Sequence, residues 1–267
     1  MCLARYSRQS FLGDQAAIRN CVVGIVGLGG GGSHVAQLLP HLGFRHYRLF
    51  DPDKVEDVNL NRMVGATLAD VANEAPKIDI AARMINGLQE SPDVIAFQAR
   101  WQDVALHLRE CDVVFGCIDG FAERRDLEAC TRRWLIPLID IGMDVHQVDP
   151  DPPRMGGQVI LSMPGGPCLT CLGFLNEQSL SREAGNYGDA GYRPQVIWSN
   201  AVLAASAVGI AVDLLTDWTR SLRSVVYLSY DGNKGLVAPH PRVAFLPEKN
   251  CPHYPATQVG EPVYLPA

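Results

Sequence analysis

The chain has 267 residues, 47% of them hydrophobic and 19% charged, so it is long enough to bury a sizeable core. Its net charge of −6 argues against a nucleic-acid-binding protein, because such proteins usually carry a basic balance. The N-terminal segment 1–20 carries charges throughout and lacks the continuous apolar core of a signal peptide. We therefore expect a cytoplasmic protein that does not enter a membrane.

In the first half of the chain, apolar runs alternate with amphipathic ones. This alternation predicts an α/β fold with a mostly parallel sheet and helices on both faces. Pro40 is expected to shorten or kink the first helix. The predicted strands are 21–27, 46–51, 93–99, 112–119 and 136–142, and the predicted helices are 33–43, 76–88 and 121–134.

In the second half of the chain, the regular alternation of predicted strands and helices ends. A turn-rich connection over 145–157 precedes a strand at 158–163, a Pro/Gly loop and a polar, glycine-rich stretch. The apolar stretch 196–218 is predicted to be a buried helix, because Asn200 and Asp213 interrupt it and its apolar core is short for a membrane span. A strand at 224–231, a turn and a proline-rich tail follow. We expect one domain, 1–267, with a nucleotide-binding half to about 143 and an elaborated half from about 144.

The stretch GIVGLGGGGS, residues 24–33, joins the first predicted strand to the first predicted helix. Gly27, Gly29 and Gly32 fit the pattern G-x-G-x-x-G, and Gly30 lies in the same run. Such a loop lets the helix N-terminus bind phosphate. Asp51 ends the second predicted strand, where an acidic residue would bind a ribose hydroxyl. These features fit NAD and ATP equally well.

Residues further along the chain favour a triphosphate. The segment DPDKVEDVNLNR, 51–62, supplies Asn59 and Arg62, and Lys77 opens the next predicted helix. A triphosphate carries about four negative charges and needs such cations. Asp119 ends the fourth predicted strand, where its carboxylate could hold Mg²⁺. Taken singly, Lys77 could be a solvated helix residue and Asp119 a helix cap.

Six motifs in this order resemble the ThiF/MoeB/HesA family of ubiquitin-activating-type enzymes: RYSRQ, GLGGGGS, DPDKVEDVNLNR, Lys77, CIDG and PCLTC. The resemblance implies a Rossmann-like adenylation domain, usually a homodimer. It implies binding of ATP·Mg²⁺ and of the C-terminal glycine tail of a small ubiquitin-fold or sulfur-carrier protein. The tail carboxylate would attack the α-phosphate, giving an acyl-adenylate and pyrophosphate.

The resemblance also implies roles for individual residues. Asp51 would bind the ribose, and Asp119 would hold Mg²⁺. Arg8, in RYSRQ, would reach the triphosphate bound by the partner subunit. The remaining nucleotide-binding residues would be the four glycines named above, Asp53, Asn59, Arg62 and Lys77; of these, Arg62 and Lys77 would join Arg8 and Asp119 as catalytic residues.

Cys168 and Cys171 form a C-x-x-C pair in a Pro/Gly loop, a spacing that can bind Zn²⁺. A redox pair is the rival interpretation, but such pairs tend to open a helix after a strand. Structural zinc in the family uses a second C-x-x-C near the chain end. Here the tail supplies Cys251, while Tyr254 stands where the fourth cysteine is expected. We predict His253 as the fourth zinc ligand.

Many family members transfer the activated tail to a cysteine in the loop before the long helix. The corresponding segment 176–196 contains no cysteine, and Tyr187 stands where the thiol would be. A phenol with a pKa of about 10 is a poor substitute for a thiol. We therefore predict adenylation without a thioester at this loop; Cys117 and Cys130 are the remaining candidates.

Three other functions remain open. The same fold could adenylate a different carboxylate, on a short peptide or on a modified tRNA base. An NAD-dependent oxidoreductase is disfavoured by Arg62, Lys77 and the C-x-x-C pair. A catalytically silent scaffold is disfavoured by the apparent completeness of the ATP-binding set.

Overall fold

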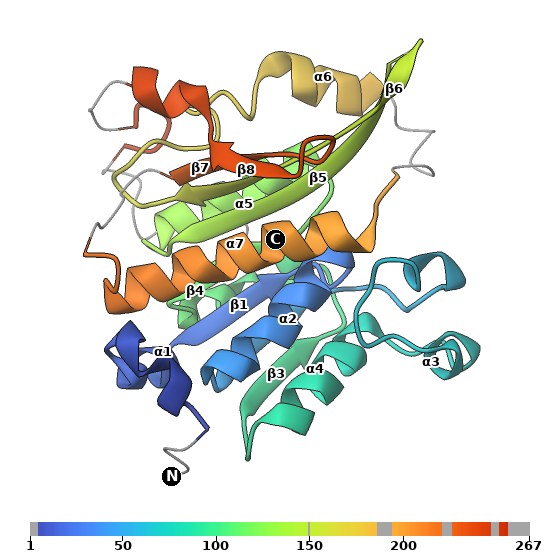
Figure 1. Ribbon diagram of the computed structural model, residues 1–267, viewed down its shortest axis with the longest axis vertical. Helices are drawn as coiled ribbons and strands as arrows, with labels where there is room; N and C mark the ends of the chain where they lie inside the picture. The colour runs from blue at the N-terminus through green and yellow to red at the C-terminus, as the bar shows by residue number, and fades with distance from the viewer. Residues whose placement is uncertain (1–4, 149, 186–193, 221–225, 247–250, 256–267) are drawn as a thin grey trace.

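The computed structural model describes residues 5–148, 150–185, 194–220, 226–246 and 251–255. Its centre is an eight-stranded sheet in the order β3-β2-β1-β4-β5-β6-β7-β8 (Figure 1). Neighbours from β3 to β5 are parallel, and those from β5 to β8 are antiparallel. The strands are β1 Val22–Val26, β2 His46–Phe50, β3 Asp93–Phe97, β4 Val113–Gly116, β5 Leu138–Val148, β6 Asp151–Ser162, β7 Val226–Asp231 and β8 Leu236–Pro239.

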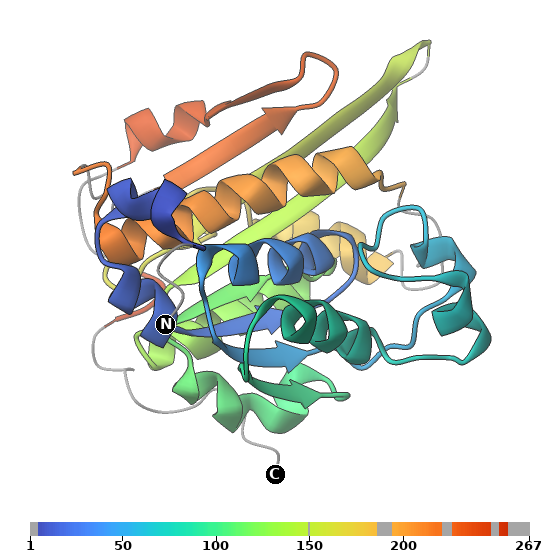
Figure 2. The same cartoon turned by 60° about the horizontal axis from the view of Figure 1, so that its bottom comes forward.

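Helices cover both faces of this sheet, which confirms the predicted α/β fold (Figures 1 and 2). Helices α1, α2, α4 and α7 pack on one face, and α5 with the 3-10 helix η3 packs on the other. The α-helices are α1 Gln15–Asn20, α2 Gly30–Leu42, α3 Leu68–Ala72, α4 Lys77–Leu88, α5 Phe121–Arg133, α6 Glu177–Gly185 and α7 Ile197–Thr216. The 3-10 helices are η1 Ser7–Leu12, η2 Asp57–Asn59, η3 Trp101–Glu110 and η4 Pro241–Phe245.

The core forms because alternate strand residues point to opposite faces. In β1, Val23 and Ile25 join the cluster under α2 and α7, whereas Val26 joins the cluster under α5 and η3. Both sides of β1 are therefore buried, as expected for a central parallel strand. Helix α2 continues past Pro40 to Leu42, so the proline does not end it.

Helix α7 is the apolar stretch that the sequence marks as a buried helix. Its length and composition would allow it to cross a membrane, but the core helix of a soluble protein passes the same test. It lies against α2, β5 and β6, where Leu203 and Ala207 are fully buried. Close packing depends on Gly157, since a Cβ there would lie 2.5 Å from Cδ1 of Leu203.

The predicted turn-rich connection over 145–157 is wrong. The segment is a long β5–β6 hairpin that projects from the body of the molecule (Figure 1). Pro152 and Pro153 lie beside a register shift between His146 and Val148. They also precede the part of β6 that pairs with β7, so their missing N–H groups cost few ladder bonds. Helix α6 and strand β8 were not predicted.

Candidate active site

A cavity of about 400 Å³ opens at the carboxyl ends of β1, β2 and β4 and beside the middle of β5. This edge is where parallel α/β sheets bind ligands. Three of the predicted glycines line it: Gly27, Gly29 and Gly30. The predicted polar residues that line it are Asp51, Asp53, Asn59, Arg62, Lys77 and Asp119. Gly32 and Arg8 are not among its lining residues.

The glycine loop owes its shape to two residues. Gly27 has a φ of 85°, and a Cβ there would lie 2.5 Å from the carbonyl oxygen of Cys117. A Cβ on Gly32 would lie 1.8 Å from the carbonyl oxygen of Gly27. These two glycines therefore let the chain turn back and let α2 approach β1 closely. The first turn of α2 faces the cavity between them.

Asp51 fastens the glycine loop to the end of β2. One carboxylate oxygen accepts the Leu28 amide at 2.6 Å, and the other accepts the Asp53 amide at 2.9 Å. Burial raises the pKa of Asp51, and the nearby Lys77 ammonium opposes that shift. Asp51 thus holds the loop in shape and still lines the cavity.

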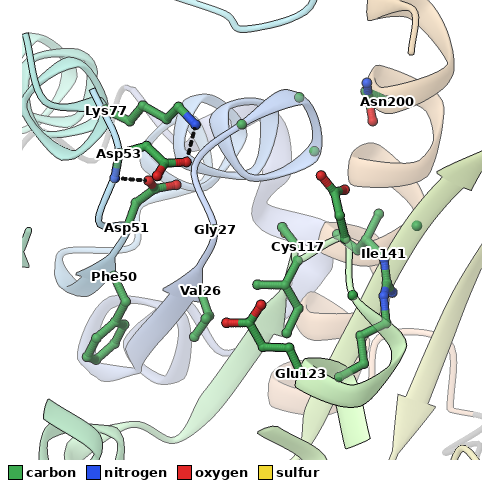
Figure 3. A pocket seen from close by; sticks show the side chains of 18 of the residues that line it. Val26, Gly27, Phe50, Asp51, Asp53, Lys77, Cys117, Glu123, Ile141 and Asn200 are labelled. Atoms are coloured by element: carbon green, nitrogen blue, oxygen red, sulfur yellow. Dashed lines mark hydrogen bonds and ion pairs between the residues drawn. The ribbon is translucent and has the colours of Figure 1, made fainter. Parts of the chain in front are cut away.

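Lys77 is the first residue of α4, and its side chain is only 11% exposed. Its ammonium lies 2.7 Å from a carboxylate oxygen of Asp53 (Figure 3). The Asp53 side chain is 62% exposed. An anionic ligand in the cavity would therefore compete with a solvated carboxylate for a largely buried ammonium group.

Asn59 and Arg62 come from η2 and the turn after it. The Asn59 side-chain oxygen accepts the Glu56 amide at 2.9 Å, which fixes the asparagine in a capping box. Arg62 donates to the carbonyl oxygen of Val58 and to the Asn61 side chain at 3.0 Å. These acceptors are neutral, so the positive charge of Arg62 remains available to a bound anion.

Asp119 follows β4 and is exposed at the mouth of the cavity. The side chain of Gln195, just before α7, donates to it at 3.4 Å. Oxygen ligands such as this carboxylate are those that Mg²⁺ prefers. The arrangement brings a candidate metal ligand within the same cavity as the cations.

Sequence reasoning missed several residues of the cavity wall. Phe50 and Trp101 form part of one end, where Phe50 stacks on Phe97 with ring centroids 5.1 Å apart. Arg124 and Asn200 line the wall near β5. In the sequence, Asn200 is recognisable only as a polar residue that interrupts a predicted buried helix. Arg124 is one of two adjacent arginines, and the sequence alone gives no signal that separates them.

Arg8 lies far from this cavity. The neighbouring Gln9 donates to the carbonyl oxygen of Leu42 at 2.7 Å, so η1 packs at the C-terminal end of α2. The cavity lies at the other end of that helix, which spans 13 residues, or about 20 Å. Arg8 therefore does not reach the cavity of its own chain.

The four predicted zinc ligands form one cluster. Their ligand atoms all lie within 4.8 Å of one another. The Cys171 sulfur lies 3.6 Å from the sulfur of Cys168 and from that of Cys251, and Nδ1 of His253 lies 3.4 to 3.8 Å from the three sulfurs. Ligands 2.3 Å from a tetrahedral centre would lie about 3.8 Å apart. The cluster is therefore the right size for zinc.

Tyr254 is not one of these four ligands and instead contacts α5. Its hydroxyl donates to Glu128 at 3.5 Å, and the guanidinium of Arg132 lies 5.4 Å from its ring centroid. Glu128 also accepts the Leu169 amide at 2.8 Å. Tyr254 and Glu128 thus dock the cysteine loop and the tail onto α5.

The strand order and the helices on both faces define a Rossmann-like α/β fold with a cavity at one edge of the sheet. The model of the ThiF family matches residues 5–253, and the chain belongs to this family. It is 30% identical over 177 residues to the SAMP-activating enzyme E1 of Haloferax volcanii, covering 64% of this chain and 62% of that protein. It is 32% identical over 142 residues to the sulfur carrier protein ThiS adenylyltransferase of Escherichia coli K12, covering 51% of this chain and 56% of that one. The chain thus spans less than two thirds of these two relatives.

A solved structure extends the likeness in fold. E. coli MccB with ATP superposes with a TM-score of 0.71 at 18% identity, covering 93% of this chain and 73% of that one. At this identity the likeness shows a shared fold.

Proposed function

We propose that this protein is an adenylyltransferase that activates the C-terminal carboxylate of a ubiquitin-like or sulfur-carrier protein. One observation carries the proposal: a single cavity gathers the glycine loop, Asp51, two cations and Asp119. Family membership and relatives named as adenylyltransferases and activating enzymes support it. In this proposal the chain is one domain, and its second half binds the carrier.

The proposed reaction requires little covalent chemistry from the protein. A carboxylate oxygen forms a bond to the α-phosphorus, and the bond from that phosphorus to pyrophosphate breaks with the electron pair leaving on pyrophosphate. No proton moves. Lys77, Arg62 and Asn59 would position the phosphates and balance their charge, and Asp51 would position the ribose. Asp119 would hold Mg²⁺, which when bound supplies charge neutralisation to the phosphates.

We further propose that the active protein is a homodimer in which Arg8 completes the partner's site. The position of Arg8 near the end of α2 that is remote from its own cavity supports this assignment. In a two-fold symmetric dimer each chain would give its arginine and receive one in return.

We infer that the cluster of Cys168, Cys171, Cys251 and His253 binds structural zinc. Its ligand spacing and its place between a loop and the chain tail support this role. Burial raises the pKa of the Cys168 thiol, so a nearby cation is needed to hold it as a thiolate. All four positions carry groups that zinc accepts in closed, tetrahedral sites.

We also infer that no thioester forms on this enzyme at the loop before α7. The loop lacks cysteine, and Tyr187 lies outside the described residues. Burial raises the pKa of Cys130 to about 12, and it raises the pKa of Cys117 as well. Neither residual candidate therefore has the thiolate character that acyl transfer requires.

Incubation with ATP, Mg²⁺ and candidate carrier proteins tests the proposed adenylation and the proposed absence of a thioester together. Intact-mass analysis should reveal a carrier–AMP adduct, and non-reducing gels should show no thiol-labile conjugate between enzyme and carrier. A short peptide tested in parallel distinguishes a carrier protein from a peptide as the substrate. Binding of NAD in place of ATP would favour an oxidoreductase. A thiol-labile conjugate would refute the absence of a thioester.

A substitution in the glycine loop separates binding from folding. Gly31 lines the cavity within α2, and a Cβ there would make only ordinary contacts, the nearest 3.7 Å from Ile141. Gly31→Ala should therefore keep the unfolding temperature of the wild type but weaken ATP binding on the order of tenfold, because the methyl group occupies ligand space. Calorimetric titration measures the affinity.

Gly32→Ala provides the contrast. Its Cβ would collide with the carbonyl oxygen of Gly27, so the unfolding temperature should fall. Equal ATP affinity of Gly31→Ala and the wild type would contradict the proposed position of the phosphates.

A further inference from the structure

Arg124 is a buried cation on the β5 side of the cavity. It lies in the first turn of α5, is 5% exposed and lines the cavity together with Ile141 and Gly142. Figure 3 shows Lys77 and Asp53 on one side of the pocket and Ile141 and Asn200 on the other, with Gly27 between them. A group that enters along β5 would therefore meet Arg124 before it meets Lys77.

Two contacts and one small residue fix the position of the Arg124 guanidinium. One nitrogen, Nη1, donates to Asp140 at 2.5 Å, and Asp140 is only 1% exposed. The guanidinium carbon lies 5.6 Å from the ring centroid of Phe174. A Cβ at Gly142 would lie 2.7 Å from Nη2. The absence of a side chain at Gly142 thus lets the guanidinium lie along β5.

Within the described residues, this guanidinium uses one of its donors. Arginine has five N–H donors, and in the described part of the chain Asp140 is the acceptor of its hydrogen bond. A buried guanidinium with unused donors at a cavity wall needs acceptors from water or from a ligand. A ligand that presents oxygen acceptors on the β5 side would satisfy these donors.

We propose that Arg124 binds the terminal carboxylate of the acyl substrate, an inference that rests on the proposed function. The carboxylate has two oxygens. One attacks the α-phosphorus while pyrophosphate leaves with the electron pair. The other stays hydrogen-bonded to Arg124 and becomes the carbonyl oxygen of the acyl-adenylate. Arg124 thereby aims the nucleophile and offsets its repulsion from the phosphates, and Asp140 and Phe174 hold Arg124 in place.

Two nucleosides test this assignment without a known carrier. The first is 5′-O-sulfamoyladenosine, which lacks an acyl group. The second carries a glycylglycyl group on the sulfamate and keeps the carbonyl oxygen of an acyl-adenylate. The full-length wild type should bind the second at least about tenfold more tightly than the first in calorimetric titrations.

The double variant Arg124→Gln, Asp140→Asn removes the guanidinium without leaving an unpaired buried carboxylate. It should bind both nucleosides with the affinity that the wild type has for the first. Arg125→Gln, which removes a guanidinium from the exposed neighbouring residue, should retain the preference for the acyl compound.

The possible outcomes distinguish failure of the Arg124 assignment from failure of the proposed adenylyltransferase function. Loss of affinity for both nucleosides in the double variant would assign Arg124 a structural role and overturn the inference. A retained acyl preference in that variant, or no preference in the wild type, would overturn it as well. Failure of the wild type to bind either nucleoside would instead count against the adenylyltransferase function.

Discussion

Mixing the Arg8→Ala and Lys77→Ala variants should restore activity that neither variant has alone. Each variant alone should lose on the order of 10² to 10³ in adenylation rate, as is typical when one positioned donor is removed. In a mixed dimer, one site has its own Lys77 and receives the partner's intact Arg8. Random exchange makes about half of the dimers mixed, so about a quarter of wild-type activity should return. The recovery is measured as the adenylation rate with an identified carrier.

A second mixture serves as the control. Lys77 and Asp119 line the same cavity of the same chain, so Lys77→Ala mixed with Asp119→Ala leaves each site with one defect. This mixture should stay inactive. No recovery in the first mixture, after tagged subunits are shown to exchange, would contradict a site shared between chains.

Loss of the metal should destabilise the protein strongly. The cluster ties the loop at Cys168 and Cys171 to the tail at Cys251, about 80 residues away, and so holds the tail on α5. Zinc contributes about 10–16 kcal/mol of apparent binding free energy in zinc-finger peptides. Even a quarter of that would lower the unfolding temperature by roughly 5–15 °C for a chain of this size. Cys171→Ser, or treatment with a chelator, should produce this shift in a thermal scan.

Two variants in the same region act as controls. Thr170→Ala changes an exposed residue between the two loop cysteines and should leave metal content and stability unchanged. His253→Cys should keep the metal, because a thiolate is an accepted ligand at the same position. Only trace zinc in protein purified without a chelator would show that the cluster is not a zinc site.

The shared location of the residues proposed to bind the nucleotide could be predicted because several of them follow buried strands. Asp51 and Asp119 each end an apolar run, and the carboxyl ends of parallel strands meet at one edge of the sheet. Lys77 could be placed because it opens a helix that enters the same edge. For these three residues, the location at the end of a strand or the start of a helix was enough to predict the edge of the sheet where they lie.

The residues of the proposed acyl-binding end could not be predicted in this way. Arg124 and Arg125 are adjacent in sequence, and only the rotation of α5 buries one and exposes the other. Its partner Asp140 is a polar residue inside an apolar run, and nothing near it in the sequence indicates that it pairs with a guanidinium on α5. The β5–β6 hairpin was missed because two prolines suggested a turn, whereas the register shift beside them makes them compatible with a strand.

The most direct test of the central claim is ATP–pyrophosphate exchange. With ATP, Mg²⁺ and a carrier that ends in glycine, labelled pyrophosphate should enter ATP, because acyl-adenylate formation is reversible. Exchange should require the carrier and should fall on the order of 10² or more in Asp119→Asn, which removes the proposed Mg²⁺ ligand. Consumption of ATP to ADP and phosphate, with no exchange across a panel of carriers and peptides, would contradict the assignment of this protein as an adenylyltransferase.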